Sequence, residues 1–257
     1  MAPARNPFFN RHRITSPAYF RGRQKELEQL YGAVLTGQCR SIVGERKTGK
    51  SSLLTHLSYP ETQRRFGLDP DHTLFSIATY KHISFLERAE VERLVREPVA
   101  PYGMEYDPLA IATIYEVAAG HPFLTQLVCH EMVVYHNETE RSYITVADLD
   151  AVLERITERG EAHFKYVWAE ADSAERAALL ALAELLTHSD GATVEEVIAL
   201  SERRGRPLER ETALQALLRL ESRDIVARTA IGSERFRFRV DLVRRWIVRN
   251  PQLADTV

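Results

Sequence analysis

Cysteine is scarce in this chain, which has only Cys39 and Cys129 among its 257 residues. The two are far apart in the sequence, with no Cys-x-x-Cys pair and no cluster with histidine, so neither a disulfide framework nor a zinc site is indicated. We interpret both as small apolar residues of the interior. The sequence also lacks the histidine spacings of metal sites and the Gly-x-Ser-x-Gly phrase of hydrolases. These absences favour a cytoplasmic protein without a nucleophilic active site.

An excess of charge of one sign is missing as well. The 34 Lys and Arg residues nearly balance the 36 Asp and Glu residues, for a net charge of -2, so composition does not indicate a nucleic-acid or membrane-surface protein. The longest apolar stretch, residues 177–186, contains Glu184 and is too short to span a membrane. The N-terminal residues lack the apolar segment of a secretory signal. With 44% hydrophobic residues, the chain has the composition of a globular protein.

The first region, residues 1–85, has the pattern of an α/β domain. Apolar residues recur at helical spacing from Arg23, and a short apolar run precedes Gly44. The expected elements are a helix from Arg23, a buried strand over 39–43, a helix over 51–57, a loop over 59–71 and one or two strands over 72–83.

The second region, residues 86–170, has a helical pattern throughout. The periodic segments cover residues 86–95, 108–119, 122–135 and 146–156. Three of them have a recognisable start: Asp107 precedes Pro108, His121 precedes Pro122, and Thr145 is followed by Asp148. We therefore predict a small all-α bundle here.

The third region, residues 171–257, combines helices with a hairpin. The expected elements are helices over 174–186, 193–203 and 209–223, strands over 225–231 and 235–240, and a helix over 242–248. In the second strand, apolar residues alternate with arginines, as in a half-buried strand. Three helices followed by a two-stranded hairpin is the order of a winged helix-turn-helix domain.

One motif indicates chemistry. The octapeptide from Gly44 to Ser51, Gly-Glu-Arg-Lys-Thr-Gly-Lys-Ser, matches G-x-x-x-x-G-K-[ST] at every fixed position, between a predicted strand and a predicted helix. Gly44 and Gly49 allow the backbone to curl so that N–H groups face phosphate oxygens. Lys50 can reach the β- and γ-phosphates, and the Ser51 hydroxyl is an oxygen ligand suited to Mg²⁺. Glu45, Arg46, Lys47 and Thr48 fill the variable positions. The charges of the first three are most simply solvated, and contact of one of them with phosphate or a neighbouring subunit stays open.

The wider sequence around this motif resembles the start of bacterial STAND-type, AAA-like P-loop ATPases. The box Phe20-Arg21-Gly22-Arg23, followed by Glu26-Leu27, precedes the loop, in the order of that family. Two later phrases resemble the same family: Gly120-His121-Pro122-Phe123, similar to its lid motif, and residues 236–246, similar to the end of its winged-helix domain. The resemblance implies a P-loop NTPase core over 1–85, a helical lid over 86–170 and a winged helix over 171–257.

The resemblance also assigns residues to a nucleotide site. Residues 44–52, Ser52 included, would hold the phosphates of ATP or ADP, with Ser51 on Mg²⁺. Gly22 and Arg23 would lie near adenine and ribose, and His121 and Pro122 would begin a lid helix that packs on the base. The simpler interpretations stay open, with Arg23 an exposed residue at a helix start and His121 a capping residue.

The second acidic residue of such ATPases, at the tip of another buried strand, is not found in the sequence. Between the loop helix and the first lid helix there is room for roughly one crossover unit. The core is therefore expected to be incomplete, either because the written sequence omits residues between about Phe75 and Tyr80 or because the protein carries a deletion there. An intact mass that matches 257 residues would exclude the first explanation.

These features predict a nucleotide-dependent switch in signalling or defence, with a protein effector or sensor as partner, oligomerisation left open, and ATP hydrolysis undecided. Two other functions remain as alternatives: a DNA-binding regulator, and a scaffold that does not hydrolyse ATP, each with a relic P-loop. Residues 223–249 contain eight arginines and three acidic residues, a net charge of +5 that could meet DNA phosphates. The predicted reading helix, 209–223, has mixed charges, which disfavours major-groove binding.

Overall fold

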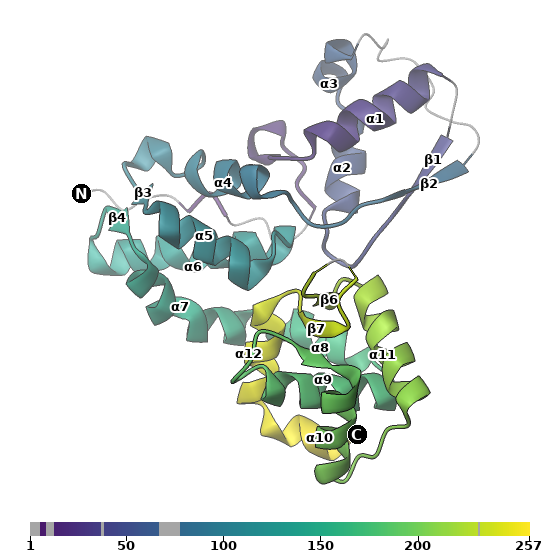
Figure 1. Cartoon of the computed structure of the whole chain (residues 1–257). Helices are drawn as coiled ribbons and strands as arrows, with labels where there is room; N and C mark the ends of the chain where they lie inside the picture. Colours follow the sequence, from purple (N-terminus) through teal and green to yellow (C-terminus); the bar gives the residue numbers. More distant parts are fainter. Residues whose placement is uncertain (1–5, 9–12, 37–38, 67–77, 231) are drawn as a thin grey trace. The chain divides into compact units, whose positions relative to one another are not determined.

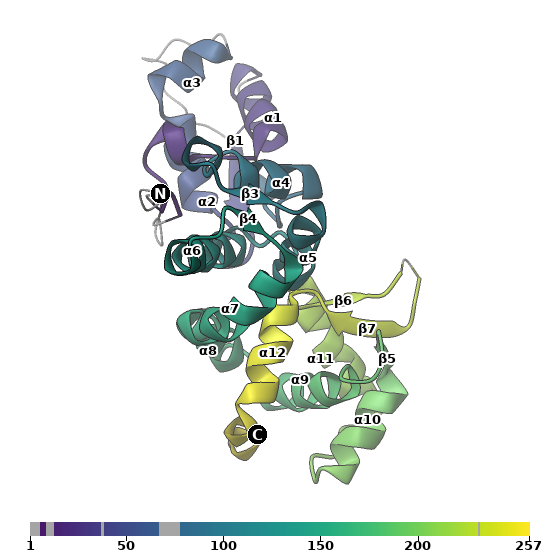
Figure 2. The ribbon, with the colours of Figure 1, turned by 90° about the vertical axis from the view of Figure 1, so that its left-hand side faces the viewer.

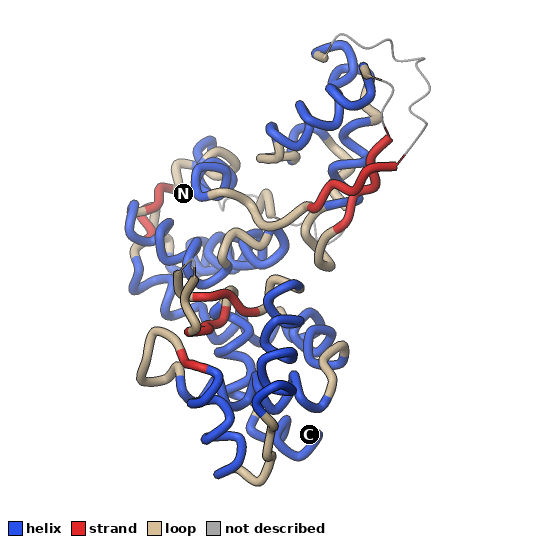
Figure 3. Tube along the Cα trace, turned by 45° about the vertical axis from the view of Figure 1, so that its right-hand side comes forward, coloured by secondary structure: helices blue, strands red, loops and turns tan. Residues whose placement is uncertain are grey.

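The computed structural model describes residues 6–8, 13–36, 39–66, 78–230 and 232–257. The chain forms two compact units, one of Met1–Tyr115 with Gly120–Val152, the other of Glu116–Ala119 with Leu153–Val257. Figures 1 and 2 show their elements, and the strands in Figure 3 are few and short. Within the described ranges, no helix is both long and apolar enough to cross a membrane.

The first unit begins with the predicted strand–loop–helix arrangement. A 3₁₀ turn, η1 (Pro17–Tyr19), precedes α1 (Gln24–Leu35); β1 (Cys39–Val43) then leads through the loop into α2 (Lys50–Leu57). β1 pairs in parallel with β2 (Ala78–His82), in the register Cys39↔Ala78 to Val43↔His82. A parallel pair requires a crossover connection, and α2 lies in this one.

A small apolar core holds this part of the unit together. Its buried members come from α1, α2 and the end of β2 and are Leu27, Leu30, Tyr31, Leu53, Leu57 and Ile83. Leu27, Leu30 and Tyr31 share one face of α1 because their spacing follows the helical repeat. Tyr31 is fully buried, and its hydroxyl donates to the carbonyl of Leu57, 2.8 Å away. The sequence pattern thus predicted the helix, but not every apolar residue of the pattern is buried, since Leu35 is exposed.

The prediction of a loop over 59–71 is wrong at its start. Residues Pro60–Arg65 form the short helix α3. Pro60 occupies the first turn, where its missing N–H removes no helical hydrogen bond, and Glu61 follows it near the positive end of the helix. Arg64 and Arg65 lie in the last turn, near the negative end. Residues 67–77, which include part of the predicted strands and Phe75, lie outside the described ranges.

The rest of the first unit is mainly helical, as predicted. Its helices are α4 (Arg88–Arg96) and α6 (Pro122–Thr139), with the 3₁₀ turn η2 (Ala100–Tyr102). The helices α5 (Pro108–Ala118) and α7 (Val146–Arg159) begin in this unit, and their last residues belong to the second. This part of the first unit is not all-α, because β3 (Glu105–Tyr106) and β4 (Tyr143–Ile144) form a short parallel pair. Two-residue strands have no periodicity to reveal them in a sequence.

The three predicted helix starts in this region are confirmed. The Asp107 carboxylate accepts from the N–H of Leu109, and the His121 ring nitrogen Nδ1 accepts from the N–H of Leu124. The Asp148 carboxylate accepts from the N–H and the hydroxyl of Thr145, at 2.8 and 2.7 Å. Each bond satisfies a polar group that a helix start would otherwise leave without a partner.

The second unit contains helices and a three-stranded antiparallel sheet. Its helices are α8 (Glu161–Ala169), α9 (Ser173–Leu185), α10 (Val194–Arg203), α11 (Arg210–Ser222) and α12 (Asp241–Arg249), followed by η3 (Pro251–Thr256). The strands β5 (Ala192–Thr193), β6 (Val226–Arg228) and β7 (Arg235–Phe238) lie in the order β5-β7-β6. The alternation predicted for β7 is confirmed, since Phe236 and Phe238 are buried and Arg235 and Arg237 exposed. Helix α8 and strand β5 were not among the predicted segments.

Candidate functional site

The loop between β1 and α2 has the backbone conformation that its two glycines permit. Gly44 has φ of 149° and Gly49 has φ of 92°, both in the region that favours glycine. A methyl group at Gly44 would lie 2.1 Å from the carbonyl oxygen of Ile83, at the end of β2. Gly44 therefore allows the loop to pass against the neighbouring strand, whereas Gly49 begins α2 with open space around it.

Lys50 lies across this loop. Its Nζ donates to the carbonyl oxygens of Gly44 and Glu45, both at 2.7 Å. The Thr48 hydroxyl donates to the same Glu45 carbonyl, and the Glu45 carboxylate accepts from the N–H of Arg46. These bonds fold residues 44–50 into a closed turn with a cation inside it. A phosphate that reached this turn would compete with the carbonyl oxygens for the ammonium group. The phosphate is the stronger acceptor because it is negatively charged and the carbonyls are neutral.

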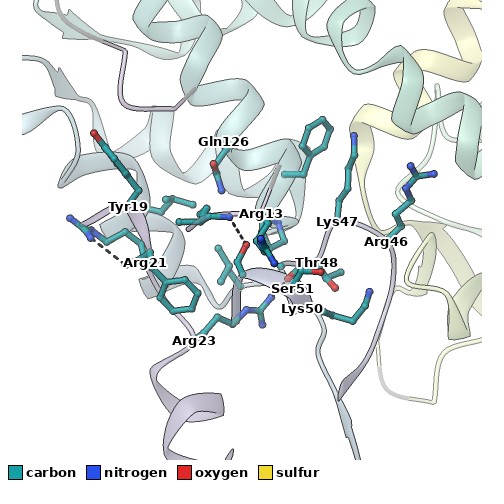
Figure 4. Close-up of a pocket in the computed structure, with 18 residues that line it drawn as sticks. Arg13, Tyr19, Arg21, Arg23, Arg46, Lys47, Thr48, Lys50, Ser51 and Gln126 are labelled. Atoms are coloured by element: carbon teal, nitrogen blue, oxygen red, sulfur yellow. Dashed lines mark hydrogen bonds between the residues drawn. The ribbon is translucent and has the colours of Figure 1, made fainter. Parts of the chain in front are cut away.

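A cavity of about 310 Å³ opens beside this turn (Figure 4). Its basic side chains come from the N-terminal segment, the start of α1 and the loop, and are Arg13, Arg21, Arg23, Arg46, Lys47 and Lys50. Among the described residues that line it, none is acidic. Cations gathered around free N–H groups at a helix start form a site for a polyanion.

The remaining lining of the cavity is mostly apolar and aromatic. These side chains are Ile14, Tyr19, Phe20, Leu86, Leu94, Pro122 and Phe123. The Phe20 ring stacks on His56 with centroids 4.1 Å apart, and burial, with the charge of Arg65, lowers the pKa of His56. Gln126 points into the cavity from α6 (Figure 4). A cavity with cationic and aromatic surfaces suits a ligand with a phosphate chain and a flat ring.

The structure brings most of the predicted site residues to this cavity. Of the predicted set, those that line it are Arg23, Arg46, Lys47, Thr48, Gly49, Lys50, Ser51, Ser52 and Pro122. Gly44 and Glu45 contribute carbonyl oxygens to the turn behind it. The Ser51 side chain is exposed, whereas the Ser52 hydroxyl accepts from the N–H of Ile14 at 2.9 Å and ties the N-terminal segment to α2.

Two predicted residues lie beside the cavity rather than in it. Gly22 lines a neighbouring cavity on the other side of Phe20 and Arg21. His121 is buried as the N-cap of α6, and its ring meets the edge of Phe85 at a centroid distance of 5.0 Å. The capping interpretation of His121 therefore describes its observed contact, and the next residue, Pro122, is the one at the cavity wall.

Sequence reasoning did not assign several residues that line the cavity. Tyr19, Phe20 and Arg21 belong to the box before α1, and Phe123 and Gln126 to the lid phrase, so the motifs located them without giving them a role. The other unassigned side chains are Arg13, Ile14, Leu86 and Leu94. The sequence has no signal for these four, because an arginine in an irregular segment and a leucine on an apolar helix face are usual in any domain.

Comparison with known proteins supports the fold. No family model matches the chain, and no curated protein matches it. Among solved structures, it is similar to the Walker-type ATPase Paby2304 of Pyrococcus abyssi, with a TM-score of 0.63 and 8% identity over 94% of this chain and 99% of that one. At so low an identity the likeness shows the fold alone, which is that of a P-loop ATPase.

More distant similarities reach two other solved proteins. A RuvB variant of Thermotoga maritima is 12% identical, with a TM-score of 0.45, over 84% of this chain and 93% of that one. The Orc1 protein of Aeropyrum pernix, solved in complex with DNA, is 10% identical, with a TM-score of 0.44, over 98% of this chain and 97% of that one. Both are too remote to support an argument about this chain.

Proposed function

We propose that this chain is a STAND-like nucleotide-dependent switch that binds ATP and ADP at the cavity beside residues 44–52. The observation that carries the proposal is that basic side chains of the loop and of the segment before α1 line one cavity together with apolar and aromatic side chains. The phosphates would meet Lys50 and the N–H groups at the start of α2. Adenine would lie among the apolar side chains, which include Pro122 and Phe20.

The side chains that line the cavity could help to hold a magnesium ion, but only when the phosphates of a nucleotide supply further oxygen ligands. Bound Mg²⁺ would reduce the negative charge of the phosphates. The exposed Ser51 hydroxyl lines the cavity and can be one oxygen ligand. In the described part of the chain no carboxylate lines the cavity, and no cluster of His, Cys, Asp or Glu suits a metal ion. The proposed role is therefore binding and release, and we assign no residue to hydrolysis.

The switch would work through the helical part of the first unit, the proposed lid. Helices α4 and α6 contribute Leu94, Pro122, Phe123 and Gln126 to the cavity wall. Lys47 of the loop lies over the Phe123 ring, with Nζ 3.5 Å from its centroid. A ligand that changes the conformation of the loop would therefore change a direct contact with α6. A difference between ATP and ADP in these contacts would shift the balance of conformations. We propose residues 171–257 as a winged helix and a separate polypeptide as the effector.

The direct test is ligand-induced stabilisation. ATP or ADP with Mg²⁺ should raise the unfolding midpoint of the whole chain, because a ligand that binds only the folded state stabilises it by mass action. Lys50→Ala should abolish the rise. Lys25→Ala is the matched control, since Lys25 is also basic and lies in α1, but its side chain is 71% exposed and pairs with Glu87. A rise that persists in Lys50→Ala would refute binding at the loop.

The DNA-binding alternative gains little from the second unit. Of the eight arginines in 223–249, seven have an acidic partner in the structure: Arg223, Arg228, Arg235, Arg239, Arg244, Arg245 and Arg249. Phosphate contacts would have to compete with these ion pairs. Electrophoretic mobility with random duplex tests the alternative, and binding that weakens steeply with salt would support it. If the chain does not bind DNA, the scaffold role remains as the alternative to the proposed switch.

A further inference from the structure

We infer that Arg23 is a positioning residue, which turns an amide of the loop toward the phosphates and joins the loop to the segment that leads into the lid. The inference rests on the proposed nucleotide site, and it concerns what Arg23 does there. The family resemblance placed Arg23 near adenine and ribose. In the structure its guanidinium is directed at backbone carbonyls beneath the loop, and the residue is only 5% exposed.

The first contact of Arg23 fixes a peptide plane in the loop. Its Nη2 donates to the carbonyl oxygen of Thr48, 3.0 Å away. That carbonyl belongs to the same peptide unit as the N–H of Gly49, and the unit is trans, as are all the described peptide bonds. In a trans peptide the C=O and N–H point in opposite directions. Arg23 therefore fixes this peptide plane with the Gly49 N–H directed away from the guanidinium. Thr48 and Gly49 both line the cavity, and in this inference the fixed N–H is a donor to the phosphates.

The second contact extends to the chain after β2. The same Nη2 donates to the carbonyl oxygen of Ser84 at 2.6 Å, so one nitrogen bridges the loop and residues 83–86. This segment is also held at both ends. Ile83 lies against Gly44, and Leu86 donates its N–H to the carbonyl of Gly120 at 2.8 Å, immediately before the lid helix α6. The loop, the segment 83–86 and the start of the lid thus form one connected backbone network.

Arg23 is itself held in an unfavourable backbone conformation. Its φ is 65°, which a residue with a side chain rarely adopts. Glu26 accepts from Nη1 at 2.8 Å, and Glu90 of α4 accepts from the backbone N–H. The Glu90 carboxylate also accepts from the N–H of Glu87 and so caps α4. Such a strained residue persists only where its surroundings fix it, and here those surroundings include the first helix of the lid.

Three ligands distinguish three roles of Arg23: positioning of the loop amide, contact with the base, and support of the fold alone. ATP, inorganic triphosphate and adenosine are titrated, with Mg²⁺, into the whole chain and into Arg23→Lys. A lysine ammonium keeps the charge, but its shorter reach cannot hold both carbonyls as the guanidinium does. We expect about a tenfold loss of affinity for ATP and for triphosphate, the size of one charged hydrogen bond, with adenosine unchanged. Lys25→Ala, which also breaks a tie between α1 and α4, should leave all three affinities unchanged.

Each other result overturns the inference. A loss for ATP and adenosine with triphosphate unchanged would place Arg23 on the base. An equal loss for all three ligands would indicate structural damage alone, and no loss would leave Arg23 without a role in binding. If Arg23→Lys does not fold, Glu26→Gln provides the test, with a smaller loss expected, about threefold, for the two phosphate ligands only. If the wild-type chain binds none of the ligands, the proposed function fails instead.

Discussion

Gly120 provides a test of the packing just before α6, because its replacement by alanine should be unusually destabilising. Its φ is 74°, and a methyl group there would lie 2.2 Å from the carbonyl oxygen of Leu86 and 3.3 Å from the ring of Tyr115. Real carbon–oxygen contacts need about 1 Å more, so the two backbones must separate. That movement would break the hydrogen bond from the Leu86 N–H to the Gly120 carbonyl.

The expected magnitude follows from these contacts. A left-handed backbone costs alanine about 1–2 kcal/mol, partly offset by about 0.4–1 kcal/mol from the less flexible unfolded chain. The lost hydrogen bond adds about 1 kcal/mol and the steric overlap about 1 kcal/mol or more. Gly120→Ala should therefore lower the free energy of unfolding by about 3 kcal/mol. Gly103→Ala, with φ of 68° and open space around it, should lose about 1 kcal/mol or less.

Urea denaturation of both variants, followed by far-ultraviolet circular dichroism, measures the difference. Tryptophan fluorescence would not serve, since Trp168 and Trp246 both lie in the second unit. If Gly120→Ala loses no more stability than Gly103→Ala, the close approach to Leu86 is not real. The backbone network that joins the loop to the start of α6 would then lose one of its hydrogen bonds.

Two further predictions concern the first unit. Burial raises the pKa of Asp148, but the hydrogen bonds from Thr145 and the charge of Arg141 outweigh it and hold the pKa below its ordinary value. Its contribution is therefore present above about pH 4 and lost as the pH falls through the lowered pKa, so Asp148→Asn should lower the urea midpoint at pH 7, by an amount that shrinks as the pH falls below about 4. Leu53 is fully buried in the core that it forms with apolar residues of α1 and with Ile83. Leu53→Ala should therefore lower the free energy of unfolding by about 3 kcal/mol; a loss below about 1 kcal/mol in the same urea assay would contradict the packing described.

The parts of the site that depend on local backbone geometry could be predicted from the sequence. Gly44 and Gly49 stand where the loop needs unusual φ values, and a strand and a helix flank them. Pro122 after His121 likewise gave the start of α6, because a proline at that position fits only a few backbone conformations. In each case a few neighbouring residues determine the structure, so no knowledge of distant contacts was needed.

The remaining parts depend on contacts between distant segments. Nothing in the sequence shows that Ile14 bonds to Ser52, or which of the apolar residues of α4 faces a cavity. The direction of the Arg23 side chain was equally inaccessible, since a helix start accommodates an arginine that points to solvent, to a ligand or to a carbonyl. The helix α3 was missed because its composition, rich in charged residues and opened by a proline, is also that of a loop.

Equilibrium binding of radiolabelled ATP to the purified chain, with Mg²⁺, tests the central claim most directly. The account predicts one ATP per chain, displaced by unlabelled ADP, and no uptake by Lys50→Ala under the same conditions. Absence of uptake by the wild-type chain at millimolar ATP, or equal uptake by the Lys50→Ala variant, would contradict it.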